Sequence, residues 1–261
     1  MVKIKEMPFA EKYAHVLEYT KLLETFVPPL LRKRPGDKAI MELKSRWDKA
    51  VQPIPDGASD ETKYEIAYHN WIRQWEGALN LVRAELGEEG VEEFTRADVD
   101  TLSKENSGPA LLLLKVMQTL SPNFAFSLTA KQMAYQLQWF TPFTVPELTG
   151  KKAVLHVPSC KILDSPEGEV ACKVGCQGII PIWLAEQFKM KYETDRKDKS
   201  CTVTLTPLQP ELSIVSSRFG RSNSVAPLMA DATISPRSWN VCARTIQYIH
   251  TQRPHAMANA K

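Results

Sequence analysis

The chain has 261 residues, of which 43% are hydrophobic and 24% are charged, and this composition excludes wholesale disorder and predicts a globular protein with a sizeable core. The longest apolar run, from Ala110 to Leu114, is too short to span a bilayer, and the amino-terminal residues lack the apolar segment of a secretory signal. We therefore expect a cytoplasmic protein that does not enter a membrane. In a reducing compartment, clustered cysteines are more often metal ligands, redox groups or buried small side chains than disulfides.

The net charge of +3 is divided unevenly along the chain. Residues 1–150 carry 18 Lys and Arg against 21 Asp and Glu, whereas residues 151–261 carry 15 against 9. A basic carboxyl half suits an anionic partner such as a nucleotide, a carboxylate substrate or RNA. Its charges are scattered, however, and no aromatic residues interleave them, so we do not expect nucleic acid to be the partner.

The first half of the chain predicts helices, because apolar residues recur at helical spacing between capping and breaking residues. The first helix is expected from Phe9 to Val27, since Pro28 and Pro29 cannot continue it. The most regular pattern begins after the capping residue Ser59 and ends at Gly87. Further helices are expected over residues 37–51, 109–120 and 129–140.

After residue 142 the pattern changes to strands and turns. Residues 152–158 predict a strand bounded by turn residues, whereas residues 179–188 have helical spacing. Two alternating segments, 189–194 and 200–206, predict a hairpin that residues 195–199 would join.

The order of these elements predicts an α+β fold. We expect a helical region over residues 1–150, a cysteine-containing α+β module over residues 151–207 packed on it, and a weakly ordered extension over residues 208–261. Only Ser238 to His250 has a helical pattern within the extension. Because the extension is basic and weakly patterned, it is a candidate contact for a protein partner.

Four of the five cysteines lie close together in the second half: Cys160, Cys172, Cys176 and Cys201. If they converge, four thiolates could bind zinc tetrahedrally or hold an iron–sulfur cluster, because soft sulfur favours those ions. This pattern predicts a metal site beside a pocket for a small-molecule ligand, in a binding, sensing or accessory protein. Paired Cys-x-x-Cys motifs are absent, so the spacing alone does not identify the metal.

Two other interpretations of the cysteines remain open. Cys176 precedes the predicted helix over residues 179–188, where a lowered thiol pKa would make it a nucleophile, with His156 as the candidate base. In that case Lys173 or Arg196 would anchor a substrate carboxylate. Alternatively, the cysteines pack as small apolar side chains.

The remaining candidate groups favour structural roles. An aromatic stripe at helical spacing is expected in the core, although such a stripe can also line a ligand pocket; its members are Tyr64, Tyr68, Trp71 and Trp75. The acidic residues 88–93 are expected on a solvated helical face. The sequence has no phosphate-binding glycine loop, nucleophile-elbow serine or His-Glu-x-x-His motif, which removes support for hydrolases of those classes.

Short motifs in the cysteine region resemble two related groups of proteins: Leu155-His-Val-Pro-Ser-Cys160, Cys172-Lys-Val-Gly-Cys176, and Tyr192-Glu-Thr-Asp195 followed by Ser200-Cys-Thr-Val-Thr-Leu205. One group is the small-molecule-binding domain named for 4-vinyl reductase, and the other is the L-2-amino-thiazoline-4-carboxylate hydrolase family. The resemblance covers about residues 60–207. It implies a pocket between the helical part and a small sheet, where cysteines bind metal or touch a small ligand. The hydrolase resemblance also implies cleavage of a carbon–nitrogen bond in a small carboxylated substrate.

Overall fold

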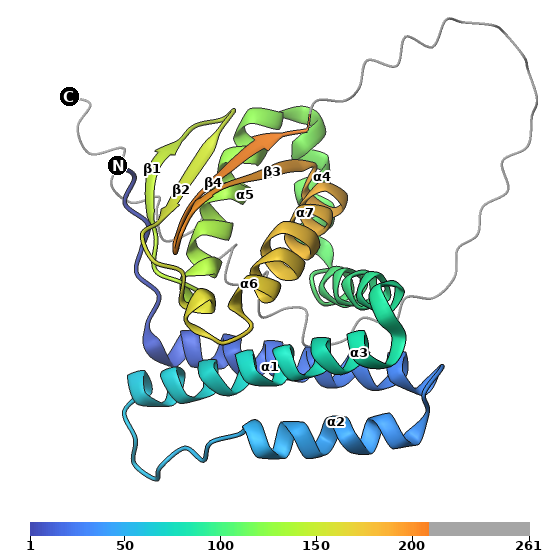
Figure 1. Cartoon of the computed structure of the whole chain (residues 1–261). Coiled ribbons are helices and arrows are strands. Elements are labelled where there is room, and N and C mark those ends of the chain that lie inside the picture. Colours follow the sequence, from blue (N-terminus) through green and yellow to red (C-terminus); the bar gives the residue numbers. More distant parts are fainter. Residues whose placement is uncertain (209–261) are drawn as a thin grey trace, which may run out of the picture.

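A computed structural model describes residues 1–208 of the chain. The predicted extension therefore falls outside the described residues from residue 209 on, and so do its expected helix and its expected partner contact. The described chain begins with a layer of three long helices, α1 (Phe9–Arg32), α2 (Asp37–Ala50) and α3 (Asp60–Glu105). Helices α1 and α2 and the first part of α3 lie side by side at the base of the molecule in Figure 1, and the later part of α3 turns away from this layer. No helix in residues 1–208 is both long and apolar enough to cross a membrane.

Helix α1 continues through the two prolines that were expected to end it. Proline removes a backbone hydrogen bond from a helix interior and destabilises it by about 3 kcal/mol or more. Here the last turns carry Val27, Leu30 and Leu31, all buried in the core that α1 shares with α3. Burial of these side chains offsets the lost hydrogen bonds, so tertiary packing overrides the local signal.

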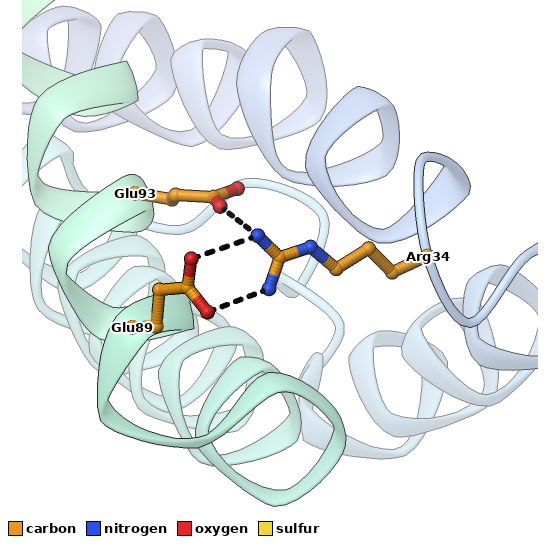
Figure 2. A network of polar contacts seen from close by, with 3 residues as sticks. All are labelled: Arg34, Glu89 and Glu93. Carbon is orange, nitrogen blue, oxygen red and sulfur yellow. Dashed lines mark hydrogen bonds and ion pairs between the residues drawn. The ribbon is translucent and has the colours of Figure 1, made fainter.

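Helix α3 begins where the sequence predicts, with the Ser59 hydroxyl accepting a hydrogen bond from the backbone N–H of Thr62. Its first helical segment ends at Gly87, as the sequence predicts, and a second segment follows within α3. This glycine has φ of 69°, a left-handed conformation that favours glycine, and the chain kinks there before the helix resumes. Beyond the kink, Glu89 and Glu93 pair with Arg34, which lies in the turn after α1 (Figure 2). The acidic residues thus form a solvated face, as expected, and join the two helices there.

The second half of the described chain is a mixed layer of short helices and strands. Its elements, in order, are α4 (Pro109–Leu120), α5 (Pro122–Gln136), η1 (Leu137–Trp139), β1 (Thr144–Leu148), β2 (Ala153–Val157), η2 (Lys161–Asp164), α6 (Gly168–Ala171), η3 (Cys172–Ile179), α7 (Ile180–Phe188), β3 (Met190–Lys197) and β4 (Ser200–Pro207). The α+β class is confirmed. Strand β1 lies within the stretch 1–150 that was predicted to be helical, so this boundary falls too late in the chain.

The four strands form one antiparallel sheet in the order β1-β2-β4-β3. One face packs on α5 and α7 through a core that includes Phe126, Met133, Leu155, Leu184 and Leu205. Residues on the opposite face of the central strands are more exposed. The predicted hairpin is present, but β3 runs to Lys197 and the turn is shorter than expected. Asp198 in this turn has φ of 52°, a conformation that aspartate tolerates better than most residues.

A second and larger core lies between the three-helix layer and the rest of the protein. Its centre is an aromatic core made of Tyr19, Tyr64, Tyr68, Trp71, Trp139 and Phe140. Two hydroxyls in it are satisfied by backbone carbonyls, because Tyr64 donates to Trp139 O and Tyr68 donates to Phe140 O, each at 2.7 Å. The aromatic stripe of α3 is therefore part of the core, as the sequence predicts.

Candidate functional site

The four cysteines predicted to share a site come together where the two cores meet. Cys160 belongs to the core of the helical layer, and Cys201 packs against both cores. Cys172 and Cys176 belong to η3 and lie beside them. Each of the four thiols is near enough to shift the pKa of at least one of the others. We call these four residues the cysteine cluster.

Strand pairing positions two members of the cluster. In the ladder, Cys201 of β4 lies between Val157 of β2 and Arg196 of β3. Cys160 follows β2 directly, and its backbone N–H donates to Lys199 O in the hairpin turn at 2.8 Å. The end of β2 is thus tied to the hairpin, which brings Cys160 close to Cys201.

The other two cysteines lie on η3, a π-helical segment that α6 introduces. Gly168 begins α6 where a Cβ atom would lie only 2.3 Å from Ile162 O, so a residue without a side chain is needed at this close approach. In a π-helix the turn is wider than in an α-helix, and such segments are frequent at functional sites. Cys172 and Cys176 are four residues apart, so the wide turn places both thiols on one side of η3.

Cys172 is the member of the cluster whose thiolate is stabilised. A side-chain hydrogen bond with Cys176 and the neighbouring Arg196 guanidinium together lower the pKa of Cys172 to about 6, although burial acts in the opposite direction. Arg196 also pairs with Glu169 at 2.6 Å. Cys172 is only 8% exposed, so its thiolate is held by these partners more than by water.

The remaining three thiols are held in the protonated form. Its hydrogen bond to Cys172, together with burial, raises the pKa of Cys176 well above the ordinary value. Burial is the largest cause of the raised pKa of Cys160 and of Cys201, which reaches about 11. One thiolate among protonated neighbours is the arrangement expected when several thiols share a small volume, because like charges disfavour each other.

Two tyrosines complete the surroundings of the cluster, one from each layer. Burial, followed by the neighbouring thiols, raises the pKa of Tyr192 on β3, so its hydroxyl stays protonated at neutral pH. Tyr68 of α3 lies close to Cys160 and Cys176 as well as belonging to the aromatic core. Sequence reasoning missed Tyr192. The alternation of Tyr192, Thr194 and Arg196 along a longer β3 would have placed it on the same face as Arg196.

The structure places the predicted base away from the cluster. His156 is exposed and lies opposite Thr202, one position along from the pair formed by Val157 and Cys201. Successive side chains of a strand point to opposite faces, so His156 and Cys201 are on different faces of the sheet. In this arrangement His156 is not within reach of Cys176. Lys173 is exposed as well, which leaves Arg196 as the predicted anchor that lies beside a thiol.

Among residues 1–208, no group of three or more His, Cys, Asp or Glu side chains is placed to hold a metal ion. The cysteine cluster is the set that would hold zinc or an iron–sulfur cluster, but its side chains would have to rearrange to form a ligand shell. The metal site therefore stays a prediction.

Comparisons of the chain with protein-family models, with curated proteins and with solved structures found no match. The resemblance to the 4-vinyl reductase domain and to the thiazoline carboxylate hydrolases remains an expectation from the sequence motifs.

Proposed function

We propose that the protein is a thiol-dependent hydrolase of a small, carboxylate-bearing molecule and that Cys172 is its nucleophile. The observation that carries the proposal is the surroundings of the Cys172 thiol: Cys176 lies four residues on in η3, Arg196 helps to lower the Cys172 pKa, and Gln177 Nε2 lies 3.8 Å from Cys172 Sγ. A thiolate is the nucleophilic form of cysteine, and these contacts favour it at neutral pH without a histidine base. This assigns the attacking role to Cys172 in place of Cys176.

The neighbouring groups fit the remaining roles in such a reaction. The Cys176 thiol is protonated and contacts Cys172, so it can return a proton to a nitrogen leaving group. Arg196 has five N–H donors, of which Glu169 engages only a part, and the Glu169 side chain is 73% exposed. A substrate carboxylate could take the place of Glu169 and form a paired contact with Arg196. The protonated Tyr192 hydroxyl is a further hydrogen-bond donor to a bound substrate.

The pH dependence of alkylation tests the proposal. Iodoacetamide labelling of Cys172, followed by mass spectrometry of tryptic peptides, should rise with pH around a midpoint near 6, because the reagent reacts with the thiolate. A free cysteine has its labelling midpoint at about pH 8.5. A midpoint for Cys172 at or above that of free cysteine in the folded protein would contradict the proposal.

A second candidate function is the metal-binding accessory role that the sequence predicts, which requires the four cysteine side chains to rearrange into a ligand shell. Elemental analysis of protein purified without oxygen tests it, since a closed tetrahedral site binds about one ion per chain. Cys201→Ser is the matched variant. A ligand loss should destabilise the protein more before metal removal than after it, whereas a packing loss should be the same in both states.

A further inference from the structure

We infer that α4 docks on an anionic lipid surface, to which it presents an exposed apolar face bordered by lysines. Such a contact lies on the membrane surface and does not cross it, so it needs no spanning helix. The residues involved are outside the cysteine cluster, so this role is independent of the proposed hydrolase activity.

Helix α4 leaves an apolar face uncovered. Its four consecutive leucines put apolar side chains on all sides of the helix, a pattern that is normally enclosed by a protein core or by lipid. Nevertheless, none of its described side chains is buried. Leu113, Val116 and Leu120 share one side of the helix, because they are three and four residues apart. Together with two neighbours they form the α4 face, whose five side chains are 48–79% exposed: Leu112, Leu113, Val116, Leu120 and Phe124.

Two exposed lysines lie beside the α4 face on α4 itself and on the segment after α7. Lys115 belongs to α4. Lys189 directly follows Phe188, whose carbonyl oxygen accepts a hydrogen bond from Gln118 Nε2 of α4 at 2.7 Å. This bond fixes the end of α7, and with it Lys189, next to the last turn of α4.

A third exposed lysine borders the end of the face that α5 contributes. Lys151 lies in the turn between β1 and β2, next to Gly150. A Cβ atom added to Gly150 would lie 2.8 Å from the Asn123 Cβ, so this turn packs closely against the residue that precedes Phe124. We call the three lysines of these positions, 115, 151 and 189, the lysine rim.

The lysine rim is free to meet an anionic partner. Acidic residues of the neighbouring strands are already paired, since Glu147 contacts Lys152 and Glu193 contacts Lys191. Within residues 1–208, the three lysines of the rim form no ion pair. An apolar face within a basic border is the combination that suits an anionic lipid surface, because apolar burial and attraction to the headgroups act together.

The charge of the rim disfavours two other occupants of the α4 face. In a symmetric dimer the same face of both copies would meet, which would bring two lysine rims together without acidic partners. The chain from residue 209 to 261 is also basic, with six Lys and Arg against two Asp and Glu. Lipid headgroups of negative charge match the rim, whereas these two occupants repeat its charge.

Co-sedimentation of the full-length chain with vesicles tests the inference. The protein should bind vesicles of an equal mixture of phosphatidylcholine and phosphatidylserine, and it should bind pure phosphatidylcholine vesicles at least about tenfold more weakly. Binding to the mixed vesicles should fall as salt rises from about 0.1 M to about 1 M, because the screening length drops from about 10 Å to about 3 Å.

Matched variants locate the contact. Leu120→Asp, at a side chain 79% exposed, should lower the partition coefficient on mixed vesicles by about tenfold or more, because a charge replaces an apolar side chain at the lipid. Lys151→Gln should lower it by about fivefold. The controls lie on α2 at the base of the molecule in Figure 1, where Met41→Asp and Lys44→Gln change exposed side chains and should bind as wild type does.

Three results would overturn the inference. The first is a lack of binding to the mixed vesicles, or equal binding by Leu120→Asp and wild type, which would place the lipid contact elsewhere in the chain. The second is a dimer in light scattering that Leu120→Asp dissociates, because a second copy would then cover the α4 face. The third is faster hydrogen exchange over residues 109–124 in full-length Trp239→Asp protein without vesicles, because the chain beyond residue 208 would then cover it.

Discussion

The aromatic core and the cysteine cluster are neighbours, since Tyr68 belongs to the core and lies close to Cys160 and Cys176, but the polar groups of the two regions have different surroundings. In the aromatic core, hydroxyls donate to backbone carbonyls and rings meet at tilted or edge-on angles, with Trp71 and Trp139 centroids 5.1 Å apart. Burial raises pKa values in both regions, including those of Tyr64 and Tyr68, but in the cysteine cluster hydrogen bonding to Cys176 and the Arg196 guanidinium lower the pKa of Cys172. Satisfied polar groups stabilise a fold, whereas a thiol pKa lowered toward neutrality marks a group available for chemistry.

The comparison teaches that burial alone does not identify a site. Cys160 and Trp71 are equally exposed, at 8%. Cys160, unlike Trp71, carries a titrating group that has other titrating groups beside it. The two regions should therefore respond to mutation through different observables: stability for the aromatic core and reactivity for the cysteine cluster.

The largest effect is expected from Trp71→Ala in the aromatic core. The indole contacts the rings of Tyr68, Trp139 and Phe140, and truncation of a buried tryptophan destabilises a protein by about 3–5 kcal/mol. Urea denaturation measures this loss. Leu112→Ala, at a side chain 67% exposed on α4, is the control and should change the free energy of unfolding by less than about 0.5 kcal/mol. If the folded fraction of the Trp71→Ala protein had a Cys172 alkylation midpoint different from that of wild type, the conclusion that the two regions respond independently would be wrong.

A smaller effect is expected from Asp98→Asn, and it should depend on pH. Burial raises the pKa of Asp98 to about 7, against a hydrogen bond from Trp75 that lowers it. The folded state binds the proton more tightly than the unfolded state, whose carboxyl has a pKa of about 3.9. Wild-type stability should therefore fall as pH rises from about 4 to 7 through this residue, and the fall should be absent in the variant. Parallel curves of unfolding free energy against pH for the two proteins would contradict the assignment.

Much of the fold could be predicted from the sequence because its signals are local. The cap at Ser59, the aromatic periodicity that follows it and the alternation of the β3–β4 hairpin all indicate the elements that form. The end of α1 could not be placed, because burial against other helices decides it. Local propensity differs by too little to outweigh such packing.

Clustering in the sequence indicated that the four cysteines would be neighbours, but the surroundings of each thiol could not be predicted. Which thiol ionises depends on the wide turn of η3 and on the strand register that sets Arg196 opposite Cys201. Because β3 was predicted to end at residue 194, Arg196 was expected in a loop. The face of the sheet on which His156 lies depends on the strand register.

The third prediction concerns the contact between the two thiols of η3. Cys176→Ala removes the hydrogen bond that is the largest cause of the lowered pKa of Cys172, so its alkylation midpoint should move up from about 6. Cys176→Ser retains a hydrogen-bond donor and should move the midpoint less. Labelling of the 162–173 peptide across a pH series measures both. Equal midpoints in wild type and Cys176→Ala would show that Arg196 alone holds the thiolate.

The smallest effect is expected at the surface contact in Figure 2, where Arg34 donates to Glu89 at 3.1 Å and to Glu93 at 2.6 Å. Arg34→Gln should lower the urea midpoint slightly, because exposed ion pairs contribute little even with paired geometry. The difference should vanish in about 1 M salt, where the screening length is about 3 Å. Arg46→Gln is the control, since Arg46 pairs with Glu42 inside α2 and joins no second helix.

Because Arg34 ties α1 to the segment beyond the Gly87 kink, only its variant should speed hydrogen exchange over residues 88–94, with Cys172 alkylation unchanged. Faster exchange in both variants would mean that the contact stabilises the helices in general and not the kinked junction.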